Sequence, residues 1–211
     1  MFKPVKILSL LLLLFLFITG TAQASKLDEI LESGKIRVGV SLFTPWAMKT
    51  TNDGLMGFEI DVANKLAEEM GVKPEFKVVV WENIIPALEN DEIDVIISGM
   101  SITPSRALRI NFSNPYAESG TSLATNISKT KVIKTMKELN QPETSIAVVS
   151  QTLGAELAGL LFDKAAIKPF SESAEAEKSV LNGDSHGYVA SMIETNFLML
   201  KNPKVIDLPL G

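Results

Sequence analysis

The chain has 211 residues, no cysteine, one histidine and a formal net charge of −5. This length suits one large or two small domains. The lack of cysteine excludes disulfide bonds and, with a single histidine, argues against zinc and haem sites. Because the chain is acidic, we expect neither a nucleic-acid partner nor binding to an anionic membrane.

Residues 1–24 have the pattern of a secretory signal peptide. Lys3 and Lys6 precede an apolar run at 7–18, and residues 22–24 (AQA) form a small-residue cleavage signal. The apolar run is shorter than the roughly 20 residues that a membrane-spanning helix needs, which favours a removable signal over an anchor. We therefore expect export and cleavage after Ala24.

Strands and helices alternate over the first half of the remaining chain. The sequence predicts a helix at 27–32, a strand at 35–40, a helix at 57–70, a strand at 75–80, a helix ending at Leu88 and a third strand beginning at Ile93. Gly34 and Gly71 are expected to end the first two helices. This order, with short connections, predicts an α/β lobe with a largely parallel sheet.

Several candidate binding residues follow the strands of this lobe. Phe43 and Trp46 come after the first strand, Trp81 comes after the second, and the third ends in the small and hydroxyl residues of 98–103. Right-handed crossovers bring these strand ends to one edge of the sheet, where open α/β sheets bind ligands. Arg106 lies in the first turn of a predicted helix, which is unfavourable for the helix dipole but suitable for gripping a carboxylate. Taken singly, each of these residues also fits a core or surface role.

The second half repeats this construction. We expect strands at 145–149, 167–170, 187–191 and 205–208, and helices at about 135–139, 151–162, 174–182 and 194–200. The stretch 120–126 is predicted to be a strand that crosses between lobes, with a second crossing near 208–211. The expected organisation is a signal peptide at 1–24, a first lobe at 25–120 and a second lobe at 121–211.

Several segments resemble the bacterial extracellular solute-binding proteins of family 3, which feed polar amino acids to ABC importers. The matching stretches are LDEILESGKIRVGV, GLMGFEIDVANKLAEEMGV and NDEIDVIISGMSITPSRALRINFSNPY, with weaker similarity in SIAVVSQTLGAE and LNGDSHGYVASMIETNFL. The resemblance implies an α/β, two-lobed periplasmic-binding-protein-like fold of type II, with each lobe a mostly parallel sheet flanked by helices.

The same resemblance implies a function. It predicts a monomeric periplasmic receptor subunit whose lobes close on a small carboxylate-bearing solute, most simply an amino acid. The importer permease is the expected partner, and neither catalysis nor a cofactor is expected. It also implies that the last part of the first lobe, to which family members return, lies outside this sequence. The sequence fits both a fragment of a longer protein and a protein that is genuinely shorter than other family members.

The resemblance assigns roles to individual residues. Arg106 matches the arginine that grips the ligand carboxylate, while Phe43 and Trp81, joined by Trp46, match the apolar walls. The remaining contacts are expected from backbone and hydroxyl groups in both lobes and from one carboxylate, namely Ser98, Gly99, Met100, Ser101, Thr152, Leu153, Gly154, Ser191 and Glu194.

Two departures from the family pattern concern the ligand's ammonium group. Ser191 stands where the family commonly has an aspartate that pairs with the ammonium, and Ser41 and Leu42 stand where an acidic residue often follows the first strand. Burying an ammonium without a partner is costly, since even a neutral polar group costs roughly 2–7 kcal/mol. Either another carboxylate substitutes, with Glu194 and Glu118 as candidates, or the ligand lacks an α-ammonium group.

Glu194 also supports an alternative function. Exported cyclohexadienyl dehydratases, which act on prephenate or arogenate, resemble this chain in the same N-terminal segments and place a proton-donating glutamate at this position. A buried carboxylic acid with a raised pKa could protonate a leaving hydroxyl group. However, Ser150 and Ser191 stand where those enzymes have asparagine and aspartate, so we expect a binding protein rather than an enzyme.

Overall fold

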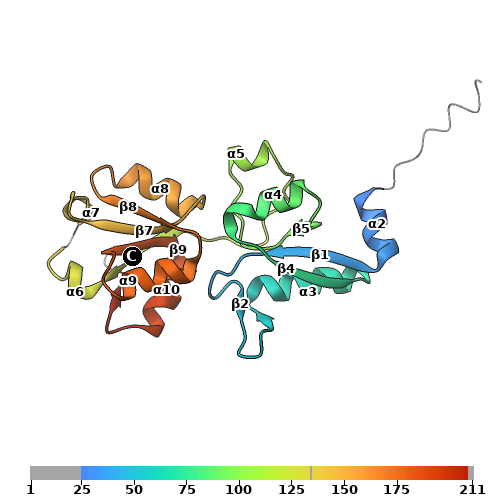
Figure 1. Cartoon of the computed structure of the whole chain (residues 1–211), viewed down its shortest axis with the longest axis horizontal. Helices are drawn as coiled ribbons and strands as arrows, with labels where there is room; N and C mark the ends of the chain where they lie inside the picture. Colours follow the sequence, from blue (N-terminus) through green and yellow to red (C-terminus); the bar gives the residue numbers. More distant parts are fainter. Residues whose placement is uncertain (1–24, 134, 209–211) are drawn as a thin grey trace, which may run out of the picture.

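The computed structural model describes residues 25–133 and 135–208, which form two lobes connected in series (Figure 1). The predicted signal peptide and most of the predicted second crossing lie outside these residues. In the part of the chain that is described, no helix is both long and apolar enough to cross a membrane.

The first lobe is built on a three-stranded parallel sheet. Strand β1 (Lys35–Val40) lies in the centre and pairs in parallel with β4 (Lys73–Val78) and with β5 (Val95–Ile96). The helices and the small hairpin of this lobe are α2 (Lys26–Ser33), α3 (Phe58–Met70), η1 (Trp81–Asn83), α4 (Ile84–Glu89), α5 (Pro104–Ala107), β2 (Met48–Lys49) and β3 (Leu55–Met56). The parallel sheet predicted for this lobe is therefore confirmed.

Local signals explain where these elements begin and end. Ser25 and Asp28 form a capping box at the start of α2, and Gly34 (φ 66°) and Gly71 (φ 70°) end α2 and α3 in the left-handed region. Val38 of β1 is fully buried among apolar residues of α3. The predicted bounds of β1 are confirmed, but β5 is shorter than expected and begins at Val95 rather than Ile93.

The second lobe contains a five-stranded mixed sheet with the order β10-β6-β9-β7-β8. Its strands are β6 (Thr121–Asn126), β7 (Ser145–Val149), β8 (Ala166–Phe170), β9 (Gly187–Ser191) and β10 (Ile206–Asp207). Strand β7 pairs in parallel with β8 and β9, whereas β6 pairs antiparallel with β9 and β10. The helices are α6 (Ile127–Thr130), α7 (Met136–Leu139), α8 (Leu153–Leu161), α9 (Ser173–Leu181) and α10 (Met192–Lys201).

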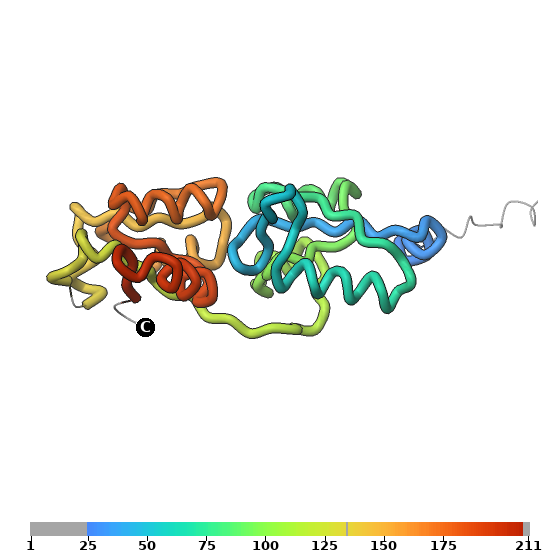
Figure 2. Tube along the Cα trace, turned by 90° about the horizontal axis from the view of Figure 1, so that it is seen from below, coloured from blue at the N-terminus to red at the C-terminus, as the bar shows by residue number. Residues whose placement is uncertain are grey.

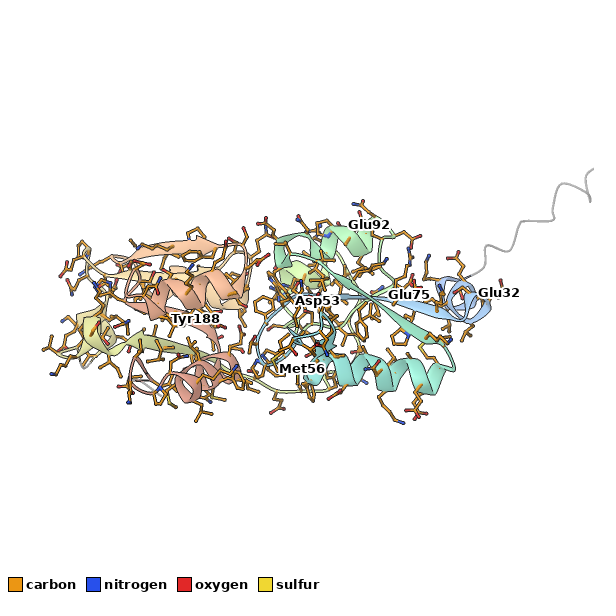
Figure 3. All side chains as sticks on the ribbon, turned by 60° about the horizontal axis from the view of Figure 1, so that its bottom comes forward. Glu32, Asp53, Met56, Glu75, Glu92 and Tyr188 are labelled. Atoms are coloured by element: carbon orange, nitrogen blue, oxygen red, sulfur yellow. The ribbon has the colours of Figure 1, made fainter. Side chains whose placement is uncertain are left out.

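Strand β7 is buried on both faces, as its unbroken apolar sequence predicts. Ile146 and Val148 pack in one apolar cluster with α8, and Ala147 and Val149 pack in another with α9 and α10. Helix α8 therefore covers one face of the sheet, and α9 and α10 cover the other (Figure 1). Tyr188, the largest fully buried side chain, lies inside this lobe (Figure 3).

One prediction about the connection between the lobes needs correction. The stretch expected to cross, 120–126, forms β6, an inner strand of the second sheet between β10 and β9. The crossing lies just before it, in an extended segment that runs from one lobe to the other (Figure 2). Leu123 and Thr125 are buried, which explains why the strand joins the second sheet. Helix α6, capped by Asn126, was not predicted from the sequence.

Asp94 joins β1 to β5 through charged hydrogen bonds. Its side chain is 5% exposed and accepts from the Arg37 backbone N–H at 2.7 Å and from the Arg37 Nη2 at 2.6 Å. Burial alone raises the pKa of Asp94, but the bonds from Arg37 outweigh it and hold the pKa below its ordinary value. A depressed pKa in the folded state gives stability that is fully present above the pKa of the unfolded chain and is lost as the pH falls through the folded-state pKa.

We predict that Asp94→Asn lowers the free energy of unfolding at pH 7 by about 1.5–3 kcal/mol, because charged hydrogen bonds are lost. The difference from the unchanged protein should begin to shrink below about pH 4, where Asp94 of the unfolded chain takes up a proton, and should vanish as the pH falls through the depressed pKa of Asp94 in the folded protein. Urea unfolding at several pH values measures both effects. Glu75→Gln is the control, since Glu75 of β4 (Figure 3) forms a solvent-exposed ion pair with Lys35. Equal losses in the two variants would contradict this account.

Candidate ligand-binding site

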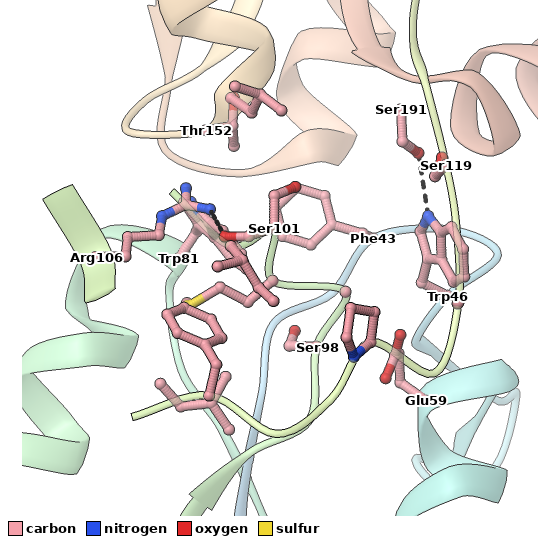
Figure 4. Close-up of a pocket in the computed structure, with 18 of the residues that line it drawn as sticks. Phe43, Trp46, Glu59, Trp81, Ser98, Ser101, Arg106, Ser119, Thr152 and Ser191 are labelled. Atoms are coloured by element: carbon pink, nitrogen blue, oxygen red, sulfur yellow. Dashed lines mark hydrogen bonds between the residues drawn. The ribbon is translucent and has the colours of Figure 1, made fainter. Parts of the chain in front are cut away.

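A cavity of about 690 Å³ lies between the lobes and is lined by both of them. It opens at the carboxyl ends of β1 and β5 in the first lobe and of β7 and β9 in the second. All residues expected as ligand contacts lie in its wall, and most are drawn in Figure 4. They are Phe43, Trp46, Trp81, Ser98, Gly99, Met100, Ser101, Arg106, Thr152, Leu153, Gly154, Ser191 and Glu194. Their role as ligand contacts remains a prediction.

Arg106 is the buried cation of this cavity. It lies on the single turn α5, which Thr103 caps by accepting the Arg106 backbone N–H, and it is 7% exposed. The guanidinium donates to the Ser101 carbonyl at 2.9 Å and, across the interface, to the Gln151 carbonyl at 2.9 Å. Burial lowers its pKa. Within the described residues it forms no ion pair, although the Glu156 carboxylate attracts it from beyond ion-pair distance, so a carboxylate entering the cavity would meet a positive charge without a direct partner.

The aromatic residues form a wall that continues into the second lobe. Phe43 and Trp81 meet edge to face with ring centroids 5.2 Å apart, and the Arg106 guanidinium lies 5.4 Å from the Trp81 ring. Phe43 and Trp81 belong to the same apolar cluster as residues of β7 and β9. The Trp81 indole donates to the Gln151 carbonyl at 3.1 Å, and the Trp46 indole donates to the Ser191 hydroxyl at 3.0 Å.

The tip of β5 places backbone groups in the cavity. The Ser98 hydroxyl accepts from the Ser41 backbone N–H at 2.8 Å, so it joins two strand ends and is less free to contact a ligand. Gly99 has φ 62°, a conformation that side chains other than glycine rarely adopt. The turn therefore exposes peptide groups close to Arg106, as the small residues of this stretch predict.

The second lobe contributes a strand-to-helix turn. Thr152 caps α8 by accepting from the Ala155 backbone N–H at 3.1 Å, and its hydroxyl donates to the Val149 carbonyl at 2.7 Å. A side chain at Gly154 would begin 3.0 Å from the Val189 carbonyl, so this close approach of helix and strand favours glycine. Gln151 has φ 60°, and this turn aims its carbonyl at Arg106 and Trp81.

Residues 36–200 match the family described as bacterial extracellular solute-binding proteins, family 3. The chain belongs to this family. The chain is 28% identical to cyclohexadienyl dehydratase from Pseudomonas aeruginosa over 185 residues, which are 87% of the chain and 69% of that protein. The ABC transporter arginine-binding protein 1 of Escherichia coli is matched at 35% identity over 106 residues, and the glutamine-binding protein GlnH of Bacillus subtilis at 31% over 162 residues. These matches span 50% and 74% of the chain, but only 42% and 58% of the two binding proteins.

Solved structures confirm the two-lobed type II fold. The ancestral amino acid-binding protein AncCDT-1, a precursor of cyclohexadienyl dehydratase, superimposes with a TM-score of 0.80 at 35% identity, covering 87% of the chain and 81% of that structure. The holo form of ArgBP from T. maritima gives a TM-score of 0.77 at 28% identity, covering 84% and 78%.

Ser191 and Glu194 form reciprocal hydrogen bonds with one another in this family member. The Ser191 hydroxyl caps α10 by accepting from the Glu194 backbone N–H, and the Glu194 Oε2 accepts from the Ser191 hydroxyl at 2.6 Å and from its backbone N–H at 3.3 Å. The Glu194 Oε1 accepts from the Tyr188 hydroxyl at 3.3 Å. Burial raises the pKa of Glu194, while the bonds from Ser191 and Tyr188 lower it. Both oxygens of this carboxylate already have donors.

The sequence analysis missed Glu59, a carboxylate in the first turn of α3 that also lines the cavity. Glu59 is 1% exposed, and its Oε2 accepts from the Tyr116 hydroxyl at 2.7 Å. Its Oε1 has no hydrogen-bond partner among the described residues. The motif GFEID was used only to recognise the family, although an acidic helix start next to the loop containing Trp46 could have suggested this position. No group of three or more His, Cys, Asp or Glu in the described ranges could hold a metal ion.

We predict that Ser191→Ala lowers the free energy of unfolding by about 0.5–2 kcal/mol, because α10 loses its cap. Glu194→Gln should change it much less, since glutamine can complete the same capping box. Urea unfolding compares the two, with Ser119→Ala, an exposed serine of the crossing segment, expected within about 0.5 kcal/mol of the unchanged protein. A larger loss for Glu194→Gln than for Ser191→Ala would show that the charge of Glu194 matters more than the cap.

Proposed function

We propose that this protein is the receptor subunit of an ABC importer and captures a small carboxylate-bearing solute, most simply an amino acid, between its two lobes. The observation that carries the proposal is Arg106, a buried guanidinium in the interlobe cavity without an ion-pair partner among the described residues. The arginine- and glutamine-binding relatives support the choice of an amino acid.

In the proposed binding step, a ligand carboxylate replaces the neutral carbonyls that now accept hydrogen bonds from Arg106. A ligand carboxylate would take the guanidinium N–H groups that now donate to the carbonyls of Ser101 and Gln151, and charged pairs of this kind are stronger than bonds to neutral carbonyls. Phe43 and Trp81 would exclude water from the pair. Because residues of both lobes line the cavity, the ligand favours the closed arrangement, which is the form we propose that the membrane permease recognises.

We further propose that the protein works in the periplasm as a monomer after cleavage behind Ala24. The signal pattern of residues 1–24 supports export, and membership of an extracellular solute-binding family agrees with it. The acidic composition and the absence of cysteine are compatible with a soluble exported receptor.

A second candidate function is a dehydratase similar to the Pseudomonas aeruginosa relative. The specific observation in its favour is Glu194, which lines the cavity, is 6% exposed and has a raised pKa because of its burial. Against it, the capping box and Tyr188 occupy both Glu194 oxygens. Incubation with prephenate or arogenate decides between the two functions, because an aromatic product that is lost in Glu194→Gln would establish the enzyme.

We predict that Arg106→Ala weakens the binding of the preferred amino acid at least tenfold, since a charged hydrogen bond contributes about 1.5–3 kcal/mol. Calorimetric titration of the full chain measures the affinity after a thermal-shift screen of amino acids and amine-free carboxylates has identified a ligand.

Arg109→Ala is the matched control for this experiment. Arg109 carries the same charge three residues away but pairs with Glu89 on the surface. Its removal should leave the affinity unchanged. Equal affinities of the Arg106→Ala variant and the unchanged protein would overturn the proposed carboxylate site.

A further inference from the structure

A hydrogen bond between the lobes closes the side of the cavity that faces Arg106. The Trp46 indole of the first lobe donates to the Ser191 hydroxyl of the second lobe at 3.0 Å. Arg106 lies on one side of the site and this pair on the other, with Phe43 drawn between them (Figure 4). A ligand whose carboxylate is held by Arg106 would therefore have Trp46 and Ser191 in the facing wall.

The Ser191 hydroxyl has no bonding capacity left for a ligand. A hydroxyl group has one proton to donate and two lone pairs that accept. The proton goes to the Glu194 Oε2 at 2.6 Å, and the lone pairs take the Trp46 indole N–H at 3.0 Å and the Glu194 backbone N–H at 3.3 Å. An ammonium group, which can only donate, finds no free acceptor on this side chain.

Glu194, the carboxylate next to Ser191, is engaged in the same way. Its Oε2 accepts from the Ser191 hydroxyl and from the Ser191 backbone N–H at 3.3 Å, and its Oε1 accepts from the Tyr188 hydroxyl at 3.3 Å. Glu194 is 6% exposed, and Tyr188 is fully buried behind it. A ligand ammonium would have to compete with the cap of α10 and with the interior of the lobe for this carboxylate.

The cavity wall contains three further carboxylates among the described residues, and none of them offers a buried ammonium a partner. Asp94 is paired with Arg37. Glu59 is 1% exposed and Gly99 lies over its carboxylate, so a molecule in the cavity does not reach it. Glu118 lies exposed in the crossing segment, where water weakens its attraction for a cation.

An α-ammonium group therefore loses water in this cavity without gaining a counter-charge. Buried cations in proteins are normally paired with an anion, because neutral acceptors replace their hydration only in part. The carbonyl of Ser101, at the tip of β5, already accepts from Arg106 at 2.9 Å. The guanidinium itself repels a second cation. The electrostatics of the described wall thus favour the carboxylate of a ligand and give its amino group no compensation.

We propose that the site recognises the carboxylate and the apolar body of its ligand but not an α-ammonium group, so that an amine-free carboxylate binds at least as tightly as the amino acid of the same shape. The rings of Phe43, Trp46 and Trp81 form the wall on which such a body packs. The inference rests on the proposed function, in which Arg106 holds the carboxylate. It extends the solute class from amino acids to their amine-free counterparts.

Calorimetric titration of the full chain with matched pairs of compounds tests the inference. The pairs are L-norleucine and hexanoate, L-phenylalanine and hydrocinnamate, and L-glutamine and glutaramate, whose members differ only in the α-amino group. We predict that the amine-free member of each pair that binds has at least half the affinity of the amino acid. Arg106→Ala should weaken both members at least tenfold, because they share the carboxylate.

Ser191→Asp supplies the missing charge at the facing wall. Aspartate caps helices as well as serine does, so α10 keeps its cap. This variant should shift the ratio of affinities at least tenfold in favour of the amino acid. Ser171→Asp is the matched control, since Ser171 is an exposed serine of the same lobe that does not line the cavity, and it should leave the ratio within twofold.

The outcomes separate this inference from the proposed function. An amino acid that binds more than twofold tighter than its amine-free counterpart, with both still dependent on Arg106, overturns the inference alone. So does an unchanged ratio in Ser191→Asp. If no compound of the set binds, or if Arg106→Ala leaves the affinities unchanged, the proposed carboxylate site itself fails. Should Ser191→Asp not fold, the ratio in the unchanged protein decides.

Discussion

The placement of a permanently charged guanidinium between two lobes constrains the surroundings of Arg106. An arginine side chain cannot lose its proton to escape burial, so every group around it must accept hydrogen bonds or present an electron-rich face. The carbonyl of Ser101 and the face of Trp81 meet this requirement from the first lobe. The carbonyl of Gln151 meets it from the second lobe and so joins the two halves.

The lobes are held together by few polar contacts besides the apolar cluster. The Gln151 carbonyl accepts from both Arg106 and Trp81, and the Ser173 hydroxyl donates to the Leu42 carbonyl at 2.9 Å. Each of these bonds is individually modest, since a typical intramolecular hydrogen bond contributes about 0.5–1.5 kcal/mol. A ligand that bridges the lobes would therefore add to a closed arrangement that the chain already supports, and it would shift a balance between open and closed forms.

The parts of this architecture that follow local rules could be predicted from sequence. The bounds of β1, β7 and β9, the glycine ends of α2 and α3, and the convergence of Phe43, Trp81 and Arg106 follow from periodicity, capping and the handedness of crossovers. Contacts between distant side chains could not be predicted in this way. Tyr116 and Glu59 are 57 residues apart, and Trp46 and Ser191 are 145 apart, so no local pattern encodes their meeting. The capping role of Ser191 and Glu194 was missed for a different reason, because comparison with the family directed attention to ligand chemistry.

The chain contains two tryptophans, and each donates its indole N–H to an acceptor in the opposite lobe. Separation of the lobes breaks both of these bonds and brings water to both rings. Because indole emission responds to hydration and hydrogen bonding, the protein carries its own optical reporter of domain movement. Trp46 lies on the side of the cavity near Ser191 and Trp81 on the side near Arg106, so variants that keep a single tryptophan would report the two sides separately.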